Sequence, residues 1–239
     1  AQTPTGGKTY TIPITTVPGY YLVPNISLYY NSQSGNGVAG YGWSIAGLSS
    51  IEIRDKNLFY DNAQEGALYS DPTACYSLDG VPIVKSENLM KGYELATAKG
   101  NIQIHKHQNS YATPSYFEVL YPDGSKAVFG FRDNRESQIS YPMTEYEDID
   151  GNRMTFEYMM EGNVYYITSI KYGKESSVEF LYSNRLEFSP ESYRAGKKIE
   201  PLEYILNKIE VKEKIDVLCD YQLEISNKDN VSLLKKIRV

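Results

Sequence analysis

Three glycines near the N-terminus have the spacing of a dinucleotide-binding loop. The segment Ser34–Gly47 reads SGNGVAGYGWSIAG and contains Gly35-x-Gly37-x-x-Gly40 after an expected strand. In dinucleotide-binding folds a helix follows such a loop at once, and its N-terminal amides bind the pyrophosphate. The residues after Gly40 include further glycines and do not favour a helix. We therefore expect an irregular loop between strands, in which glycines permit left-handed backbone angles and Trp43 lies flat against main chain.

The two histidines of the chain, His105 and His107, have a spacing that metal sites use. A strand would place both imidazoles on one face, with Lys106 on the other. A metal site needs a third ligand, and the sequence contains no further histidine. Two exposed polar side chains on one strand face explain the pattern more simply, so no metal site is predicted.

The segment Asp148-Ile-Asp150-Gly-Asn152 begins like a calcium-binding loop. Its glycine falls too early for an EF-hand, and Met159 stands where the bidentate glutamate should be. A hairpin turn accounts for the same residues, because Asp-Gly supplies the positive backbone φ that tight hairpins require.

Acidic residues gather before this turn, and a glycoside hydrolase would need two of them facing each other across a cleft. The residues are Asp133, Glu136, Glu145, Glu147 and Asp148. A Ser-His-Asp triad would have to use one of the two histidines, and no Gly-x-Ser-x-Gly elbow is present. Surface carboxylates are the simpler interpretation. We predict no catalytic residues, no cofactor and no enzyme, and the sequence does not identify a ligand-binding residue.

Tyrosine is unusually frequent, with 23 tyrosines against one tryptophan and seven phenylalanines. Tyrosine favours strands, and it packs as an aromatic ring while its hydroxyl stays wet. One interpretation of the pairs Tyr20-Tyr21, Tyr29-Tyr30 and Tyr165-Tyr166 is a platform for stacking sugars. More often such a pair places one ring in a core and the other on a wet face.

The elements that would position these residues are strands. Apolar and polar residues alternate along Arg153–Tyr158, along Val178–Tyr182 and along Val217–Ile225, which indicates half-buried antiparallel strands. Hairpin signals lie between the strands at Leu78-Asp79-Gly80, Tyr121-Pro-Asp-Gly124 and Ile149-Asp-Gly-Asn152. Helical periodicity is absent except for one possible short turn at Ser86–Lys91. The pattern predicts an all-β fold, an antiparallel meander of hairpins forming a large twisted sheet, a sandwich or a partial shell.

A weak repeat marks the last third of the chain. Ile205–Val211 resembles Leu233–Val239, and Ile167–Tyr172 is a shorter version. A turn and a strand ending in tyrosine follow the first two copies, whereas the copy at Leu233–Val239 has no successor in this sequence. A strand without a partner is a poor end for a domain. We expect the chain to be a piece of a longer protein, or to lie beside other strands in an assembly.

Charge and composition disfavour several classes of function. The formal net charge is -6 and no basic stripe is visible, which disfavours binding to nucleic acid or to an anionic membrane. No apolar run is long enough to span a bilayer. Ala1-Gln2 fits an N-terminus left by signal-peptide removal, so we expect a secreted or cell-surface bacterial protein. Cys75 and Cys219 are expected to be free thiols rather than a disulfide.

Several segments closely resemble the N-terminal signature of the SpvB domain family. They are Tyr10-Thr-Ile-Pro-Ile14, Pro24-Asn-Ile-Ser-Leu-Tyr-Tyr30, Gly40-Tyr-Gly-Trp43 and Tyr76-Ser-Leu-Asp-Gly80. This family includes the N-terminal part of the Salmonella virulence plasmid B protein and the TcB-type components of insecticidal Tc toxins. The likeness is strong over residues 8–80 and looser after residue 140, where Asp150–Tyr158 and Tyr165–Tyr172 resemble the approach to RHS or YD repeats. Little can be matched over residues 84–115.

The resemblance implies a virulence-related or toxin-related module without catalysis. In the toxin relatives this region belongs to a β-sheet shell, continued by RHS repeats, that encloses another polypeptide. We expect residues 1–239 to form one all-β module, with an SpvB-like region at 1–110 and a hairpin meander at 111–239. The expected partners are downstream RHS/YD repeats or an enclosed polypeptide. The alternative is a wall-associated or cell-surface module that binds glycan or protein through exposed tyrosines.

Overall fold

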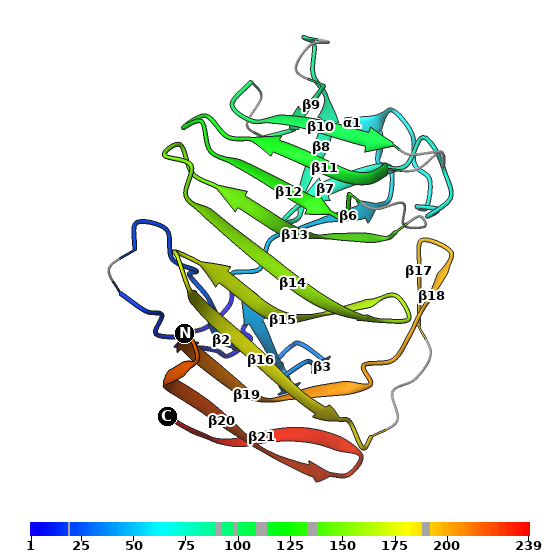
Figure 1. The fold of residues 1–239 in the computed structure, drawn as a ribbon. Coiled ribbons are helices and arrows are strands. Elements are labelled where there is room, and N and C mark those ends of the chain that lie inside the picture. The colour runs from blue at the N-terminus through cyan, green and yellow to red at the C-terminus, as the bar shows by residue number, and fades with distance from the viewer. Residues whose placement is uncertain (19, 89–91, 98–99, 109–113, 133–137, 188–191) are drawn as a thin grey trace. The chain divides into compact units, whose positions relative to one another are not determined.

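The chain forms two compact units, each built from antiparallel strands (Figure 1). The computed structural model describes residues 1–18, 20–88, 92–97, 100–108, 114–132, 138–187 and 192–239. Unit 1 comprises residues 1–48, 154–191 and 200–239, and unit 2 comprises residues 49–153 and 192–199. The predicted all-β class and the antiparallel hairpins are confirmed.

Unit 1 contains a sheet of long strands in the order β21-β20-β19-β16-β15-β14. These strands are β14 (Arg153–Glu161), β15 (Val164–Tyr172), β16 (Ser176–Asn184), β19 (Tyr204–Glu213), β20 (Asp216–Lys228) and β21 (Val231–Arg238). The N-terminal residues add a three-stranded sheet and a two-stranded ribbon. Their strands are β1 (Thr9–Pro13), β2 (Ser27–Asn31) and β5 (Trp43–Ala46), with β3 (Asn36–Gly37) paired to β4 (Gly40–Tyr41).

The alternation seen in the sequence becomes the buried face of unit 1. Val178 and Phe180 of β16 lie opposite Val211 and Ile209 of β19, and all four side chains are buried. The repeat segments fall in β15, β19 and β21, and the first two each lead into a hairpin with the next strand of the sheet. In β20 the alternation predicts that Val217 is buried, whereas this residue is 46% exposed near the turn.

Unit 2 is a second set of hairpins. Its strands β6 (Ser50–Arg54), β7 (Cys75–Leu78), β8 (Val81–Lys85) and β9 (Tyr93–Leu95) follow β13 (Ser140–Glu147) in one pairing order. A second order runs from β13 through β12 (Lys126–Gly130) and β11 (Pro114–Leu120) to β10 (Gln103–Gln108). The hairpin of β17 (Ser192–Arg194) and β18 (Lys197–Ile199) joins this unit through the Arg194–Glu52 ion pair, with 2.5 Å between the charged atoms.

The core of unit 2 is aromatic at its centre. Tyr76, Phe117 and Tyr141 pack edge to face with ring centroids 5.0–5.9 Å apart, a favoured geometry for aromatic pairs. Aliphatic side chains such as Ile51 and Ile104, both fully buried, surround these rings. The core holds β6, β7, β10, β11 and β13 together, and a pocket opens beside it.

The structure also contains one element that the sequence analysis missed. Helix α1 (Leu58–Asp61) is a single turn, and the side chain of its N-cap Asn57 accepts a hydrogen bond from the Tyr60 amide. An asparagine at this position stabilises a helix start, but one turn is too short to produce helical periodicity. The short turn considered at Ser86–Lys91 lies partly outside the described residues.

Candidate functional site

The glycine-rich segment is a tight hairpin and not a phosphate-binding loop. Gly37 and Gly40 pair across β3 and β4, and strand β5, not a helix, follows. A Cβ at Gly37 would lie 1.9 Å from the Trp43 carbonyl oxygen, so only glycine fits there. The ring of Trp43 packs beside Tyr30 with centroids 5.3 Å apart. The close approach at Gly37 is therefore made by the Trp43 main chain, and the Trp43 ring contacts another ring.

The histidine pair on β10 is more buried than the sequence suggested. His107 stacks on Tyr116, with centroids 4.4 Å apart, and its Nε2 lies 2.9 Å from a Glu118 carboxylate oxygen. Both histidines are half-buried rather than exposed, and strand β11 supplies the ring and the carboxylate beside His107. Arg132 also contacts Glu118, at 3.1 Å. In the described part of the chain, no group of three or more His, Cys, Asp and Glu side chains is arranged to hold a metal ion.

The segment at Asp148 is a turn held by its own aspartate. The Asp148 carboxylate accepts hydrogen bonds from the amides of Asp150 and Asn152 at 3.0 and 2.8 Å, and Gly151 has a φ of +81°. These bonds lower the pKa of Asp148, the Asn152 side chain contributing most. Because the Asp148 carboxylate accepts the hydrogen bonds that stabilise the turn, a hairpin explains this sequence, as expected.

The other acidic candidates do not form a catalytic pair among the described residues. Glu147 binds Lys126 and Arg153, both of which lower its pKa, and Glu145 lies 3.7 Å from Arg132. These carboxylates pair with nearby cations rather than with another carboxylate. Asp133 and Glu136 lie outside the described residues.

The three tyrosine pairs differ in how the two rings of each pair are buried. Tyr21 is 97% exposed beside the half-buried Tyr20, as expected for one ring in and one ring out. Tyr166 is buried beside the half-buried Tyr165, whose hydroxyl is also buried, so this pair has no ring on a wet face. Tyr29 and Tyr30 are both half-buried, so the expectation is wrong for that pair. The pairs do not share a common exposed stacking pattern.

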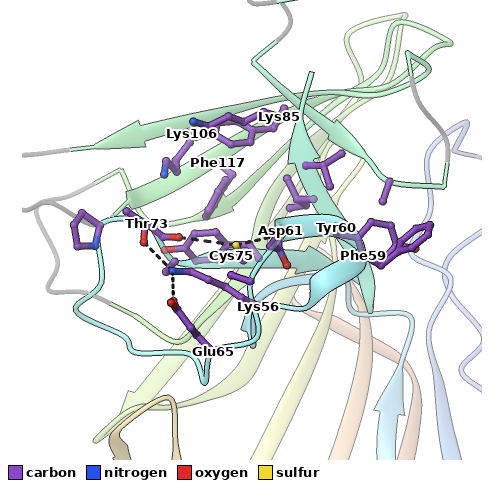
Figure 2. A pocket seen from close by; sticks show the side chains of 18 of the residues that line it. Lys56, Phe59, Tyr60, Asp61, Glu65, Thr73, Cys75, Lys85, Lys106 and Phe117 are labelled. Atoms are coloured by element: carbon purple, nitrogen blue, oxygen red, sulfur yellow. Dashed lines mark hydrogen bonds and ion pairs between the residues drawn. The ribbon is translucent and has the colours of Figure 1, made fainter. Parts of the chain in front are cut away.

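Unit 2 contains a pocket of about 910 Å³ that the sequence analysis did not identify (Figure 2). The side chains that characterise it are Lys56, Tyr60, Cys75, Tyr93, Lys106 and Phe117. These residues come from α1 and from segments that are distant in sequence, so no local sequence motif predicts the pocket. The volume is within the range of about 300–1,000 Å³ that is typical of ligand pockets.

Three of the charged side chains that line this pocket, Lys56, Asp61 and Glu65, are held in ion pairs. Asp61 accepts two hydrogen bonds from Arg54, at 2.6 and 2.9 Å, and the pair lowers the pKa of Asp61 to about 2. Lys56 Nζ lies 2.8 Å from Glu65. Burial and the neighbouring Asp61, whose Oδ1 accepts a hydrogen bond from the Cys75 thiol at 3.3 Å, raise the pKa of Cys75. A thiol with a raised pKa is a poor nucleophile. Cys75 and Cys219 are both free thiols, as predicted.

A second cluster lies inside unit 1 and was also missed. Arg185 and Glu187 form an ion pair with both side chains fully buried. Glu187 also accepts a hydrogen bond of 2.5 Å from Ser232 of β21, and Arg185 donates one of 2.6 Å to the Gly37 carbonyl. The ion pair therefore joins the glycine hairpin to the last strand of the sheet.

That last strand is the outer member of the unit 1 sheet. β21 pairs with β20 along its length, and the glycine hairpin approaches its other side at Ser232 and Leu234, where a Cβ on Gly40 would lie 3.2–3.3 Å from main-chain atoms. Along Lys235–Arg238 no described strand pairs with the outer side of β21. This stretch is the open sheet edge, and such edges are templates for pairing with further strands.

Comparison with known proteins identifies the family. The family model of SpvB, the Salmonella virulence plasmid 65kDa B protein, matches residues 2–195. The chain belongs to the SpvB family. This confirms the resemblance found in the sequence. Nothing among the curated proteins matches the chain.

Solved structures share the fold of this SpvB family member. The N-terminal domain of the effector protein SpvB from Salmonella typhimurium superposes with a TM-score of 0.77 at 15% identity, covering 96% of this chain and 97% of that domain. The TcdB2-TccC3 chain superposes with a TM-score of 0.77 at 15% identity and covers all of this chain, which spans 16% of it. A Tc holotoxin pore from Photorhabdus luminescens gives a TM-score of 0.71 at 14% identity, over 99% of this chain and 15% of that one.

The chain therefore shares the fold of a domain from an effector protein and of part of a Tc holotoxin pore. The chain spans about one sixth of the toxin chains that it matches. In the described residues, no helix has the length and apolar character needed to cross a membrane.

Proposed function

We propose that this chain is a non-catalytic structural module of a secreted or surface toxin-like protein, and that it contributes to a β-sheet shell which encloses or carries another polypeptide. The observation that carries the proposal is the open edge of β21 at Lys235–Arg238, at the end of a sheet of long strands. The fold shared with the TcdB2-TccC3 chain supports it, since that chain continues well beyond the matched region.

The mechanism is sheet extension. An incoming strand pairs its main chain with the open edge, so affinity comes from main-chain hydrogen bonds and specificity from the flanking side chains. Lys235, Lys236 and Arg238 are exposed on this edge, and such charges discourage pairing with an unrelated strand. We expect downstream RHS or YD repeats to supply the next strand, in one all-β module that spans residues 1–239.

The state of two ionisable groups in the unit 2 pocket supports the part of the proposal that assigns no catalysis to the chain. The pocket thiol Cys75 has a raised pKa, and Asp61 is held ionised by Arg54. A general acid or base needs a pKa near the working pH, and neither group meets that need. The shell role therefore explains the described residues without requiring a reaction.

Hydrogen–deuterium exchange tests the proposal directly. In residues 1–239 alone, the outward-facing amides of Lys235–Arg238 should exchange fast, because water is their only partner. In a protein extended past Val239 by its own following sequence, the same amides should become protected. The interior strand β19, which pairs with β16 and β20, is the matched control and should be protected in both proteins.

Unchanged exchange at Lys235–Arg238 in the extended protein would contradict sheet extension. A second readout is thermal stability, which should be higher for the extended protein because the edge strand gains a partner. Equal melting temperatures would argue against the proposal in the same way.

The alternative function, binding of surface glycan or protein, depends on exposed tyrosines. The structure leaves Tyr10, Tyr21 and Tyr41 of unit 1 exposed at 62, 97 and 44%. A glycan array with the isolated chain separates the two functions, because a shell segment should bind no glycan. Binding that is lost in Tyr21→Ala would favour the alternative.

A further inference from the structure

The pocket of unit 2 contains an ammonium group without a counter-ion. Lys106 of β10 is half-buried, and its Nζ lies 5.5 Å from the ring centroid of Tyr93 and 6.0 Å from that of Tyr76. The faces of aromatic rings attract a cation but do not neutralise it. Among the described residues, Lys106 makes no ion pair. Burial raises the pKa of Tyr76, so its hydroxyl stays neutral and supplies no counter-charge.

The other lining charges do not compensate Lys106. Asp61 is paired with Arg54, and Glu65 with Lys56, as described above. The remaining lining carboxylate, Glu87, is exposed, so water screens its charge. Lys85 also lines the pocket without an ion pair in the described part of the chain. Lys106, Lys85 and Phe117 lie at the same end of the pocket in Figure 2. Water screens the exposed Lys85 as it screens Glu87, so the half-buried Lys106 is the charge that makes this end cationic, in a chain whose net charge is -6.

The walls around this charge are apolar and aromatic. Phe117 is 1% exposed and belongs to the core beneath the pocket. Phe59 and Tyr60 of α1 line another side of the pocket, with centroids 4.8 Å apart, and Phe59 is 86% exposed. A helical turn that leaves an aromatic ring in water at the mouth of a pocket offers a flat apolar surface to a ligand.

We propose that this pocket binds a carboxylate carried on a flat aromatic group, with the carboxylate on Lys106 and the ring against the aromatic walls. Such a group could belong to a free aromatic acid or to the C-terminal aromatic residue of a polypeptide. The chemistry is the same in both cases, and the experiment separates the two sources. This binding does not depend on the shell role, because it uses only residues of unit 2.

A matched pair of small probes measures how much the charge of the carboxylate contributes to binding. We would titrate the protein with 1-naphthylacetate and with its neutral amide, 1-naphthylacetamide, by calorimetry or by ligand-observed NMR. The acid should bind about tenfold more tightly than the amide, which corresponds to about 1.4 kcal/mol. In Lys106→Met, which keeps an unbranched apolar side chain between the rings, the two probes should bind equally. Lys106→Arg keeps the charge and should retain the preference for the acid.

Lys174→Met is the control, because Lys174 is an exposed turn lysine of unit 1 and its loss should leave the preference unchanged. Circular dichroism checks that each variant is folded. Equal binding of the acid and the amide to the unaltered protein would overturn the proposal, as would an undiminished preference in folded Lys106→Met. Failure of both probes to bind at millimolar concentration would overturn it too.

A second titration identifies the source. An acetylated tripeptide that ends in phenylalanine with a free carboxylate is compared with 1-naphthylacetate. Tighter binding of the peptide assigns the site to a polypeptide terminus, and tighter binding of the naphthyl acid assigns it to a free acid. Either result supports the carboxylate chemistry, and neither bears on hydrogen exchange at the β21 edge, so the two proposals fail separately.

Discussion

The buried ion pair of unit 1 provides the sharpest test of the fold. Glu187 accepts hydrogen bonds from Arg185 and from Ser232 of β21, and neither charged side chain is exposed to water. Replacing Glu187 with leucine removes the counter-charge and leaves the Arg185 guanidinium buried without one. Removing one member of a buried pair costs about 3–5 kcal/mol of stability. We therefore expect Glu187→Leu to be among the most damaging single substitutions in unit 1.

The double variant separates the charge effect from general damage. Arg185→Met together with Glu187→Leu removes both charges, and it also removes the Arg185 Nε–H, which has no hydrogen-bond partner in the structure. The Gly37 carbonyl and the Ser232 hydroxyl lose a partner in the double variant, so recovery should be partial. Contacting residues typically show coupling energies of about 0.5–3 kcal/mol, and we expect at least about 1 kcal/mol here.

The single tryptophan makes the measurement specific to unit 1. Trp43 lies in β5 of that unit, so its fluorescence during urea unfolding reports on the unit that contains the ion pair. Free energies of unfolding are compared for the unaltered protein, the two single variants and the double variant. If the single losses add to the double loss within about 0.5 kcal/mol, the residues are not coupled and the reasoning is refuted.

Acid provides an independent readout of the same pair. Burial alone would raise the pKa of Glu187, but the hydrogen bonds from Ser232 and Arg185 lower it below its ordinary value. A carboxylate with a lowered pKa in the folded state stabilises the fold above its unfolded pKa of about 4.3, and this contribution is lost as the pH falls. The stability difference between the unaltered protein and Glu187→Leu should therefore shrink below that pH.

Three further predictions use the same unfolding assays. Gly37→Ala should cost about 2–3 kcal/mol, the upper part of the overpacking range, because its Cβ would lie 1.9 Å from a main-chain oxygen; Gly35→Ala, with open space at that position, is the control and should cost less than half as much. Tyr172→Phe should cost about 1–3 kcal/mol, because the buried Val17 amide loses the acceptor that lies 2.9 Å away, and a loss near zero would contradict the role of that bond. Burial raises the pKa of Tyr121 to about 12 from the ordinary 10.0. Its neutral form therefore stabilises unit 2 fully below pH 10, and the melting temperature followed by circular dichroism should fall above that pH, less steeply in Tyr121→Phe.

Local signals were sufficient to predict β14, β16 and β20 and the three Asp-Gly turns. The Asp79-Gly80 turn between β7 and β8 has positive φ at both residues, +47° and +83°, as an Asp-Gly hairpin requires. Alternation located β16 correctly. It failed at Val217 because alternation marks which residues share a face, whereas burial depends on what covers that face. The period of apolar residues in the sequence does not show what packs against that face.

The functional features depend on contacts between distant residues, which explains why they were missed. The two histidines of β10 have a spacing that suggests a metal site, whereas Lys106 between them belongs to no sequence motif. What sets Lys106 apart is its position between rings from β7 and β9, which pattern analysis cannot place. In the sequence, Arg185 and Glu187 cannot be told from ordinary surface charges, because their burial also depends on contacts with distant residues. Only the asparagine cap before α1 was a local signal that could have been used.

The excess of tyrosine over phenylalanine has a structural explanation in unit 1. The Tyr172 hydroxyl accepts a hydrogen bond from the Val17 amide and the Tyr221 hydroxyl one from the Thr15 amide, both at 2.9 Å. These amides belong to the irregular segment between β1 and β2, and no strand in the described part of the chain pairs with them. A buried main-chain donor without an acceptor costs free energy. A phenylalanine could fill the same volume but could not accept the bond. Tyrosines on the sheet thus let an irregular segment pack against it, and this segment should loosen when either hydroxyl is removed.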